Sequence, residues 1–495
     1  MSDKNKQINV TTPRPSREGE GGGSPNPLIA LIPLLTLVAM VSISIYFFGS
    51  DALSGANQIS LMMATAVCTC LAMAKYKTPW KVIEKSIEST IGNTSASIVI
   101  LLLIGMMSGA WMISGVVPTL IYYGIQIMSP TFFLVCTTII CAAVSVMTGS
   151  SWTTVATIGI ALLGIGNALG ISHAWTAGAI ISGSYFGDKI SPLSDTTVLA
   201  ASAARVDIFA HIRYMLRTTV PTFAIAAAIF LIAGIVFGST GDTDVKTYTE
   251  GLSKSFNISL WTLTVPLFTG ILIAKKVPSI ITLFLSAMAA GIVALVLQFD
   301  IIQQIGSSTD YTTTLSKAVR GVFITLFTST NIDTGNAALN NLVSTHGMAG
   351  MLDTVWLILC AMCFGGAMTA TGMLQSITGV IVNLVRGRIS LVAATAGTGI
   401  TLNLVTSDQY MSIVLDCDMY RDVYDRMGFK RTLLSRSTED STTVTSVLIP
   451  WNTCGMTQST VLGVATLDYL PYCFFNYLSP LMTIFVAAIS KRNNK

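Results

Sequence analysis

The sequence has few charged residues and very few histidines. Only 11% of its 495 residues are Asp, Glu, Lys or Arg, and three are His, whereas about a quarter of the residues in an ordinary soluble domain are charged. This deficit excludes a soluble globular protein. The net charge of +4 is too small to indicate nucleic-acid binding. Nine cysteines, an odd number, do not form a disulfide framework.

Long apolar runs are present instead. Hydrophobic residues make up 52% of the chain, and several runs are close to the twenty residues or so that a helix needs to cross a bilayer. We therefore predict an all-α polytopic membrane protein with ten spans. They lie at 28–48, 59–74, 97–117, 172–204 with a polar break, 219–238, 256–274, 277–299, 352–373, 441–469 with a polar break, and 471–490.

Two further apolar segments carry a short polar string near the middle. Segment 131–169 is interrupted by TGSS at 148–151, and segment 389–424 by TSDQ at 406–409. We interpret both as re-entrant hairpins that do not cross the membrane. Residues 1–26 are polar and rich in Pro, Gly and Ser, which predicts a disordered cytoplasmic tail.

The basic residues give the orientation, because they concentrate in cytoplasmic loops. With the N-terminus inside and ten crossings, all of them fall on the cytoplasmic side except Lys189, Lys246, Lys254, Lys317 and Arg320. This distribution predicts that both termini are cytoplasmic. The chain is expected in the cell inner (plasma) membrane.

The order of features repeats along the chain. Gly109 recurs as Gly366 and Ser150 as Ser407, each 257 residues later. Each half contributes an odd number of crossings, five, so the second half is predicted to be upside down relative to the first. The predicted halves are 27–240 and 256–495, joined by an external linker at 241–255. The alternative is that Gly and Pro match by coincidence in an apolar chain.

The polar breaks are the candidate binding site. Backbone that is not helical survives inside a bilayer only where it lines a cavity or is buried in protein. The two hairpin tips and the breaks at 183–197 and 450–460 combine hydroxyl residues with Gly or Pro. Such segments supply carbonyl oxygens for a cation and free N–H groups for an anion. We predict that all four converge near the membrane midplane.

Carboxylates lie in or next to these breaks, and an acidic group in the membrane is rarely without a function. Asp188 can pair with Lys189 as a structural ion pair or bind a ligand. Asp195 can cap a helix beginning at Thr196 or act as a hard oxygen ligand. The predicted cation- and proton-binding residues are Asp195, Asp188, Ser150, Ser151, Ser194, Thr196, Ser407, Asp408, Asn452 and Thr453.

A second group is predicted to act in coupling or gating, namely Lys189, Glu439 and His211. Each also has a plainer interpretation. Glu439, with Asp440, can be a first-turn carboxylate at a helix start near the cytoplasm. His211 lies in a basic stretch and can be a membrane-surface histidine beside Arg213.

The strings GSYFGDKISPLSDTTVLA, TGSSWTTVATIG, GAWMISGVVPTLIYYG and IPWNTCG strongly resemble the NhaC-type sodium/proton antiporter family. The similarity runs from about Leu28 to the C-terminus. It implies coupling to sodium or protons, and some members of the wider group exchange malate for lactate. It also implies roles for Asp188, Asp195, Ser150, Ser151, Asn452 and Thr453. The chain departs from the family at Ser184 and Thr369, and the latter puts a proton role for its helix in doubt.

The expected mechanism is competition between Na+ and H+ for one site at Asp195, in an antiporter that needs no cofactor beyond the transported ions. One alternative is an organic-anion exchanger coupled to Na+ or H+. Another is a membrane enzyme that uses Asp188 and Asp195 as an acid–base pair, but the sequence shows neither a metal cluster nor a nucleophile motif. The expected partners are the lipid bilayer and a second copy in a homodimer.

Overall fold

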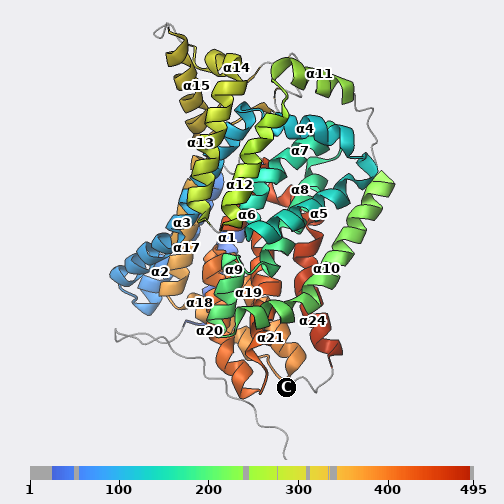
Figure 1. Cartoon of the computed structure of the whole chain (residues 1–495). Coiled ribbons are helices and arrows are strands. Elements are labelled where there is room, and N and C mark those ends of the chain that lie inside the picture. Colours follow the sequence, from blue (N-terminus) through green and yellow to red (C-terminus); the bar gives the residue numbers. More distant parts are fainter. Residues whose placement is uncertain are drawn as a thin grey trace, which may run out of the picture.

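The structure is a computed structural model, and it describes residues 25–48, 55–237, 245–275, 277–307, 313–332, 334, 340 and 343–490. In this part of the chain the protein is helical (Figure 1), and its only paired extended backbone is the bridge between Thr330 and Thr345. Nine of the described helices are long and apolar enough to cross a membrane, or eleven if two bent pairs count as spans. The prediction of an all-α multi-pass membrane protein is confirmed.

The helices of the first half are α1 Pro27–Phe48, α2 Ala56–Tyr76, α3 Trp80–Ile113, α4 Val116–Ile127, α5 Pro130–Thr148, α6 Ser151–Thr154, the π-helix η2 Val155–Gly159, α7 Ile160–Ala168, α8 His173–Ile190, α9 Asp195–Ala203, α10 Ile208–Phe237 and α11 Val245–Ser255. Those of the second half are η3 Leu260–Leu263, α12 Thr264–Ala274, α13 Ser279–Leu297, α14 Phe299–Ile305, α15 Thr314–Phe327, η4 Ala349–Met351, α17 Leu352–Ala370, α18 Met373–Val382, α19 Arg388–Thr406, α20 Gln409–Arg426, α21 Arg431–Thr438, the π-helix η5 Glu439–Thr443, η6 Ser446–Leu448, α22 Thr453–Leu462, α23 Thr466–Tyr469, η7 Leu470–Tyr472 and α24 Phe474–Ile489.

The order of the elements in the first half returns in the second half. Helices α5, α6, α8 and α9 are matched by α19, α20, α21 and α22, each of which begins 258 residues later. Before them, the turns after α3 and α17 each contain a glycine with positive φ, Gly115 at 81° and Gly372 at 71°. Glycine takes this conformation without a steric penalty. The residue matches along the sequence therefore fall on recurring elements.

Several helices begin earlier than the apolar runs predicted. α3 begins at Trp80 instead of Ser97, α10 at Ile208 instead of Thr219, and the second broken segment at Arg431 instead of Ser441. α11 forms within the predicted linker, whose first four residues lie outside the described part, as do residues 1–24 of the predicted tail. The first turns of these helices lie in stretches that contain charged residues, so apolar runs in the sequence do not indicate where the helices begin.

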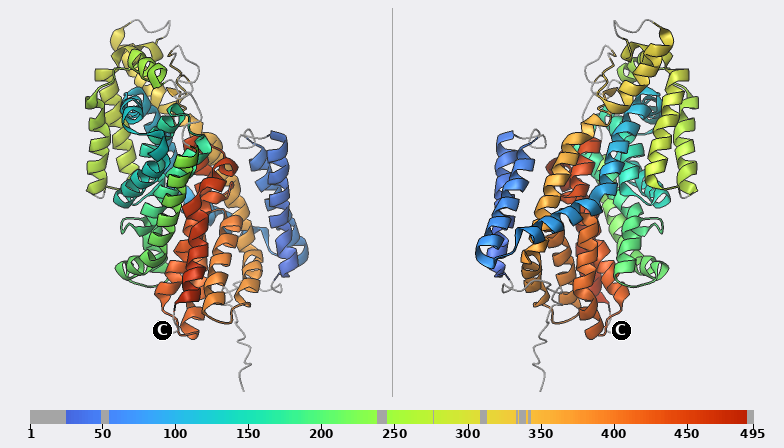
Figure 2. Two further views of the ribbon diagram at one scale, coloured as in Figure 1. Left: turned by 90° about the vertical axis from the view of Figure 1, so that its right-hand side faces the viewer. Right: turned by 90° about the vertical axis from the view of Figure 1, so that its left-hand side faces the viewer.

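The helix pairs α1–α2 and α12–α13 stand on opposite sides of the molecule (Figure 2). α3 and α17 pack against each other and reach both pairs, since α17 contacts α2 and α3 contacts α13. Trp111 Nε1 donates a hydrogen bond to Ser286 Oγ over 2.9 Å between α3 and α13, and Gln58 Nε2 donates to the Asp353 carbonyl over 3.2 Å between α2 and α17. The hairpins and broken helices lie between the two pairs.

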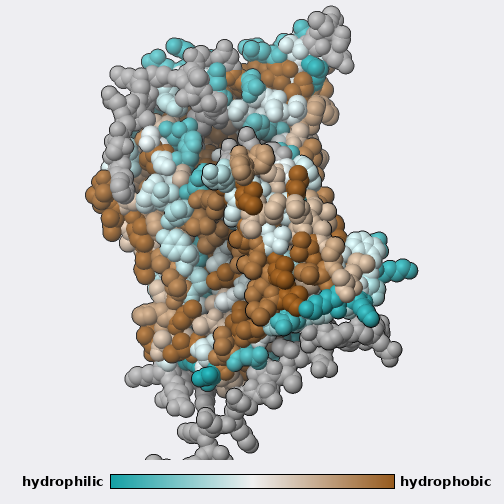
Figure 3. Space-filling view, turned by 180° about the vertical axis from the view of Figure 1, so that it is seen from behind, coloured by the Kyte–Doolittle hydropathy of each residue, from teal (hydrophilic) through white to brown (hydrophobic). Residues whose placement is uncertain are grey.

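The surface agrees with a membrane location. Hydrophobic residues gather over the middle of the face shown in Figure 3, and hydrophilic residues lie along its upper and lower edges. Large apolar side chains that are exposed include Phe209, Ile232 and Ile235 on α10 and Ile292 and Val296 on α13. Exposed apolar helix faces of this kind are what a lipid environment allows.

Candidate functional site

Asp188 joins the first hairpin tip to the first helix break. Its Oδ2 accepts hydrogen bonds from the Ser151 backbone N–H, at 3.1 Å, and from Ser151 Oγ, at 2.6 Å. Its Oδ1 accepts a hydrogen bond from Ser194 Oγ at 2.6 Å. The carboxylate is buried, so these three donors replace the water that it loses. Of the two interpretations of Asp188, the ion pair with its neighbour Lys189 is wrong, because Lys189 is paired with Asp440.

Both hairpin tips have the same backbone geometry. Gly149 and Ser407 each end a helix with positive φ, at 67° and 58°. The next residues, Ser150 and Asp408, cap the following helices by accepting hydrogen bonds from the backbone N–H groups of Thr153 and Met411. Short polar side chains at these positions satisfy the free N–H groups of a helix start. The predicted polar tips at 148–151 and 406–409 are confirmed as tight turns between helices.

The two breaks also end in capped helix starts. Ser194 caps α9, and Asn452 caps α22. The helix after the first break thus begins at Asp195. Of the two interpretations of Asp195, the helix cap before Thr196 is wrong, and the oxygen ligand stays a prediction. Ser194 and Thr196 are joined through their hydroxyls at 3.0 Å.

The second tip and the second break contact each other. The Thr453 backbone N–H donates to the Ser407 carbonyl over 2.9 Å, and Thr453 Oγ1 lies 3.5 Å from Asp408 Oδ2. All four predicted residues of this half, Ser407, Asp408, Asn452 and Thr453, are buried. The structure thus assembles each tip with the break of its own half.

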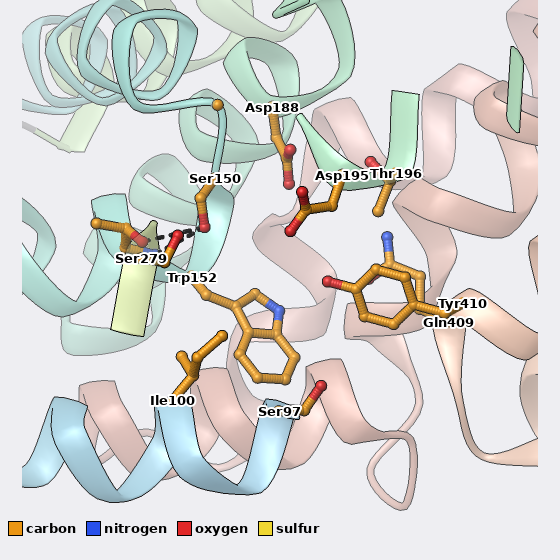
Figure 4. Close-up of a pocket in the computed structure, with 12 residues that line it drawn as sticks. Ser97, Ile100, Ser150, Trp152, Asp188, Asp195, Thr196, Ser279, Gln409 and Tyr410 are labelled. Carbon is orange, nitrogen blue, oxygen red and sulfur yellow. Dashed lines mark hydrogen bonds between the residues drawn. The ribbon is translucent and has the colours of Figure 1, made fainter. Parts of the chain in front are cut away.

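A pocket lies where the first tip, the first break and the second hairpin meet (Figure 4). Its walls come from α3, the first tip, α6, α8, α9, α13 and the start of α20. The lining residues are Ser97, Ile100, Gly149, Ser150, Trp152, Thr153, Asp188, Asp195, Thr196, Ser279, Gln409 and Tyr410. The space that a water-sized sphere can occupy in it has a volume of about 30 Å³, which suits a small ion or water better than an organic acid.

Asp195 is the exposed carboxylate of this pocket. Among the ten predicted binding residues it alone has an exposed side chain. In Figure 4 its carboxylate lies next to that of Asp188 and faces the side chains of Trp152 and Tyr410. No hydrogen bond from another described residue occupies it. Asp188 is already held by three donors, so Asp195 is the carboxylate that is free to bind an arriving cation.

Elements of the two halves cross over around the pocket. α9 of the first half packs against α20 of the second, and α22 of the second half packs against η2 and α7 of the first. Cys454 Sγ lies 2.6 Å from Gln409 Oε1, which connects α22 to the pocket lining. The predicted convergence holds for the first tip, the first break and the second tip, which share the pocket. The second break, at 450–460, does not line the pocket. It is connected to the pocket through the contacts of α22 with Gln409, η2 and α7.

A second polar cluster is buried beyond the pocket. Lys189 forms an ion pair with Asp440 and donates to Ser479 Oγ over 2.9 Å, and both charged side chains have no exposed surface. Arg436 Nε lies 3.7 Å from Asp440 Oδ2. Burial corrects the sequence interpretation here, since the basic-residue distribution places Arg436 in a cytoplasmic loop. Buried charges need such pairing because desolvation is costly.

Glu439 and His211 belong to the same region. Glu439 and Asp440 lie in the first turn of the π-helix η5, which directly follows α21. The first-turn interpretation of the sequence therefore holds for their position, and both side chains are buried. His211 is buried too, with Nδ1 2.8 Å from Ser435 Oγ, so it is not a membrane-surface histidine. A coupling or gating role for Lys189, Glu439 and His211 stays a prediction.

Most residues of the pocket's walls are not among the predicted binding residues. Gln409 is the last residue of the predicted tip at 406–409, and Trp152 and Tyr410 directly follow the two predicted tips. Their position next to the predicted binding residues was therefore a signal that the sequence offered. The sequence contains no signal for Ser97, Ile100 and Ser279. They lie in ordinary apolar helices and reach the pocket only through packing between distant segments.

Comparison with known proteins gives a consistent family. The model of the "Na+/H+ antiporter family" matches residues 25–215 and 183–491. The "Na(+)/H(+) antiporter NhaC" of Bacillus subtilis is 36% identical over 417 residues, 83% of this chain and 88% of the relative. The protein of the same name from Alkalihalophilus pseudofirmus is 37% identical over 405 residues, 82% of this chain and 84% of the relative.

A third relative has another printed activity. The "Malate-2H(+)/Na(+)-lactate antiporter" of Bacillus subtilis is 36% identical over 403 residues, which cover 81% of this chain and 82% of the relative. The chain is 36% identical both to a Na+/H+ antiporter and to a malate–lactate antiporter. Overall sequence identity therefore does not identify the transported substrate. The chemistry of the pocket has to do so.

Proposed function

Because the chain belongs to the Na+/H+ antiporter family, we propose that it exchanges Na+ for H+ across the cell membrane at a shared carboxylate site. The observation that carries this proposal is the Asp195 carboxylate, which is exposed in a small oxygen-lined pocket beside buried Asp188. Carboxylate, hydroxyl and carbonyl oxygens are the donors that hard cations prefer.

Exchange follows from competition for Asp195. When Asp195 is deprotonated, its charge and the oxygens of Ser150 and Thr196 hold Na+. When Asp195 takes a proton, that charge is lost and Na+ leaves. Asp188, Ser151 and Ser194 hold the tip against the break, so that the oxygens stay in place. The apparent affinity for Na+ therefore falls as the pH falls.

The second half completes the transport unit. Ser407, Asp408, Asn452 and Thr453 form the matching tip and break, and we propose that they stabilise the bound cation from the opposite side of the membrane midplane. The recurrence of element starts at a fixed spacing of 258 residues supports an inverted repeat with ten crossings, two re-entrant hairpins and two broken helices. In this arrangement both termini are cytoplasmic.

An organic anion is a poorer cargo for this pocket. Two carboxylates, Asp188 and Asp195, would repel it, and among the described residues no lysine or arginine lines the pocket. Lys189, the nearest basic residue in the sequence, is engaged by Asp440 and Ser479. The pocket's chemistry thus favours Na+ over the malate–lactate alternative.

The test uses everted membrane vesicles that contain a pH-sensitive dye. Adding NaCl without any organic acid is expected to release protons and restore dye fluorescence in the native protein. Asp195→Asn is expected to lose this response. Asp300→Asn is the matched control, because Asp300 is also an exposed first-turn aspartate, on α14, and should respond like the native protein. A retained sodium response in Asp195→Asn would remove Asp195 from the site.

A further inference from the structure

The second hairpin and the second break contribute few side chains to the pocket. Among their described residues, two line it, Gln409 and Tyr410 at the start of α20. The four residues of these segments that were predicted to bind the cation are not in its walls, namely Ser407, Asp408, Asn452 and Thr453. A cation beside Asp195 therefore meets these segments directly only at Gln409 or at Tyr410.

The side chain of Gln409 is already engaged. Its Oε1 lies 2.6 Å from Cys454 Sγ on α22, and its Nε2 donates a hydrogen bond to the Thr443 carbonyl of η5 over 3.4 Å. Only the amide oxygen of a glutamine can bind a cation, because the amide nitrogen is a donor. Since a thiol already contacts that oxygen, Gln409 connects α20 to α22 and η5 and is not the available ligand.

The hydroxyl of Tyr410 is available. The side chain is half-buried, and no hydrogen bond joins its hydroxyl to another described residue. Figure 4 shows its hydroxyl end turned toward the Asp195 carboxylate, and it is within electrostatic reach of Asp195 and Asp188. The phenol and the carboxylate thus face each other across the pocket without a direct hydrogen bond. The space in the pocket has the size of a small ion or a water molecule.

The neighbouring side chains leave the phenol as the neutral ligand opposite Asp195. A phenol oxygen carries lone pairs that can bind a cation, whereas the indole N–H of Trp152 is only a donor. Ser97 and Ser279 carry hydroxyls, but they lie on α3 and α13, outside the hairpins and broken helices. Hard cations bind to charged and neutral oxygens together. Asp195 and Tyr410 supply one oxygen group of each kind.

We propose that the Tyr410 hydroxyl is a ligand of the transported cation, which bridges Tyr410 to Asp195. This inference rests on the proposed Na+/H+ exchange. Asp195 is the first residue of α9 and Tyr410 the second residue of α20, and the two helices pack against each other. Asp408 caps α20 by accepting a hydrogen bond from the Met411 backbone N–H over 2.8 Å, which holds the first turn with Tyr410 in place. The second hairpin thus acts on the cation through Tyr410.

Tyr410→Phe tests this role, because it keeps the ring and removes only the oxygen. A lost polar contact to a charged group weakens binding by about tenfold. In everted vesicles at one fixed alkaline pH, the variant is therefore expected to need about tenfold more Na+ than the native protein for half-maximal recovery of dye fluorescence. Its maximal rate should stay within about twofold of the native rate, as for a loss of uniform binding.

Thermal unfolding in detergent measures Na+ binding without transport. The hydroxyl of Tyr410 has no hydrogen bond to another described residue, so Tyr410→Phe should keep the native melting temperature when Na+ is absent. Na+ that binds the folded protein raises its melting temperature. In Tyr410→Phe this rise should require about tenfold more Na+ than in the native protein.

Tyr420→Phe is the matched control on the same helix. The Tyr420 hydroxyl is buried away from the pocket and lies 2.8 Å from Thr398 Oγ1. Its loss should lower the melting temperature and leave the Na+ requirement unchanged. A native Na+ requirement in Tyr410→Phe, or an equal increase in both variants, overturns the ligand role of Tyr410 and leaves Na+/H+ exchange intact. If Na+ drives no proton movement in the native protein, the proposed function itself fails.

Discussion

At the scale of single residues, the two carboxylates of the pocket have different tasks. Asp188 is buried and accepts three hydrogen bonds that tie the first tip to the first break. Asp195 is exposed and has no such partners. The same residue type therefore serves as a structural connector at one position and as an open ligand at the other, seven residues along the chain.

This difference predicts different effects on stability. Asp188→Asn replaces a charged acceptor with a neutral one and leaves at least one of its donors unpaired, which should lower the free energy of unfolding by about 2 kcal/mol. Asp195→Asn should change it by less than about 0.5 kcal/mol, because an exposed side chain without partners contributes little. Thermal unfolding of both variants in detergent without Na+ measures the difference. Equal destabilisation would contradict the division of tasks.

The ion pair between Lys189 and Asp440 makes a second residue-scale prediction. Lys189→Met or Asp440→Asn alone leaves the other charge buried without its partner, and each should cost about 3–5 kcal/mol. The double variant has neither charge and should be more stable than either single variant. A double-mutant cycle from thermal or denaturant unfolding gives the coupling. Additive losses would show that the two charges do not depend on each other.

At the scale of elements, the sequence predicted the tips and breaks well, because Ser, Thr, Asp, Gly and Pro favour the ends of helices over their interiors. It failed for the beginning of the second broken segment, which lies at Arg431 and not at Ser441. Its string RSTEDSTTVTS has the composition of a surface loop, yet residues 435–446 are all buried. Several of their hydroxyls donate to carbonyls of the same helical stretch, as Ser441 Oγ does to the Ser437 carbonyl. Other groups have partners on distant elements, such as Lys189 for Asp440 and Asn403 for the Thr442 carbonyl, and a single sequence does not reveal such pairing.

The first tip offers a sharp test of close packing. A Cβ atom on Gly149 would lie 2.6 Å from the Leu193 backbone carbon, and φ is 67°. Gly149→Ala should therefore push the tip away from the break and abolish Na+-dependent proton flux. Gly463→Ala is the matched control, since Gly463 also ends a helix, with φ 64°, but has nothing within 4 Å of that position. It should lose about 1 kcal/mol of stability and keep its flux. Normal flux in Gly149→Ala would mean that the tip need not touch the break.

At the scale of the whole molecule, the helices can be divided into two groups. We define the scaffold as α1, α2, α3, α12, α13 and α17, because α3 and α17 pack against each other and against the outer pairs. We define the transport unit as α5 to α9 together with α19 to α22. Within it, α9 packs on α20 and α22 packs on η2, so the two halves are interlocked. We predict that alternating access moves the transport unit as one body against the scaffold.

Two disulfide pairs test this motion in a variant that lacks all other cysteines. Ala200→Cys with native Cys417 joins α9 to α20 inside the transport unit, where Cys417 Sγ lies 3.9 Å from the Ala200 carbonyl. Oxidation of this pair should leave Na+-driven proton flux unchanged. Thr354→Cys with Thr460→Cys joins α17 of the scaffold to α22 of the transport unit. In the native protein the hydroxyl oxygens of Thr354 and Thr460 lie 2.5 Å apart. Oxidation of this second pair should stop flux, and reduction should restore it. If the first pair also stops flux, the two halves move relative to each other. If neither does, the boundary between the two bodies does not run between α17 and α22.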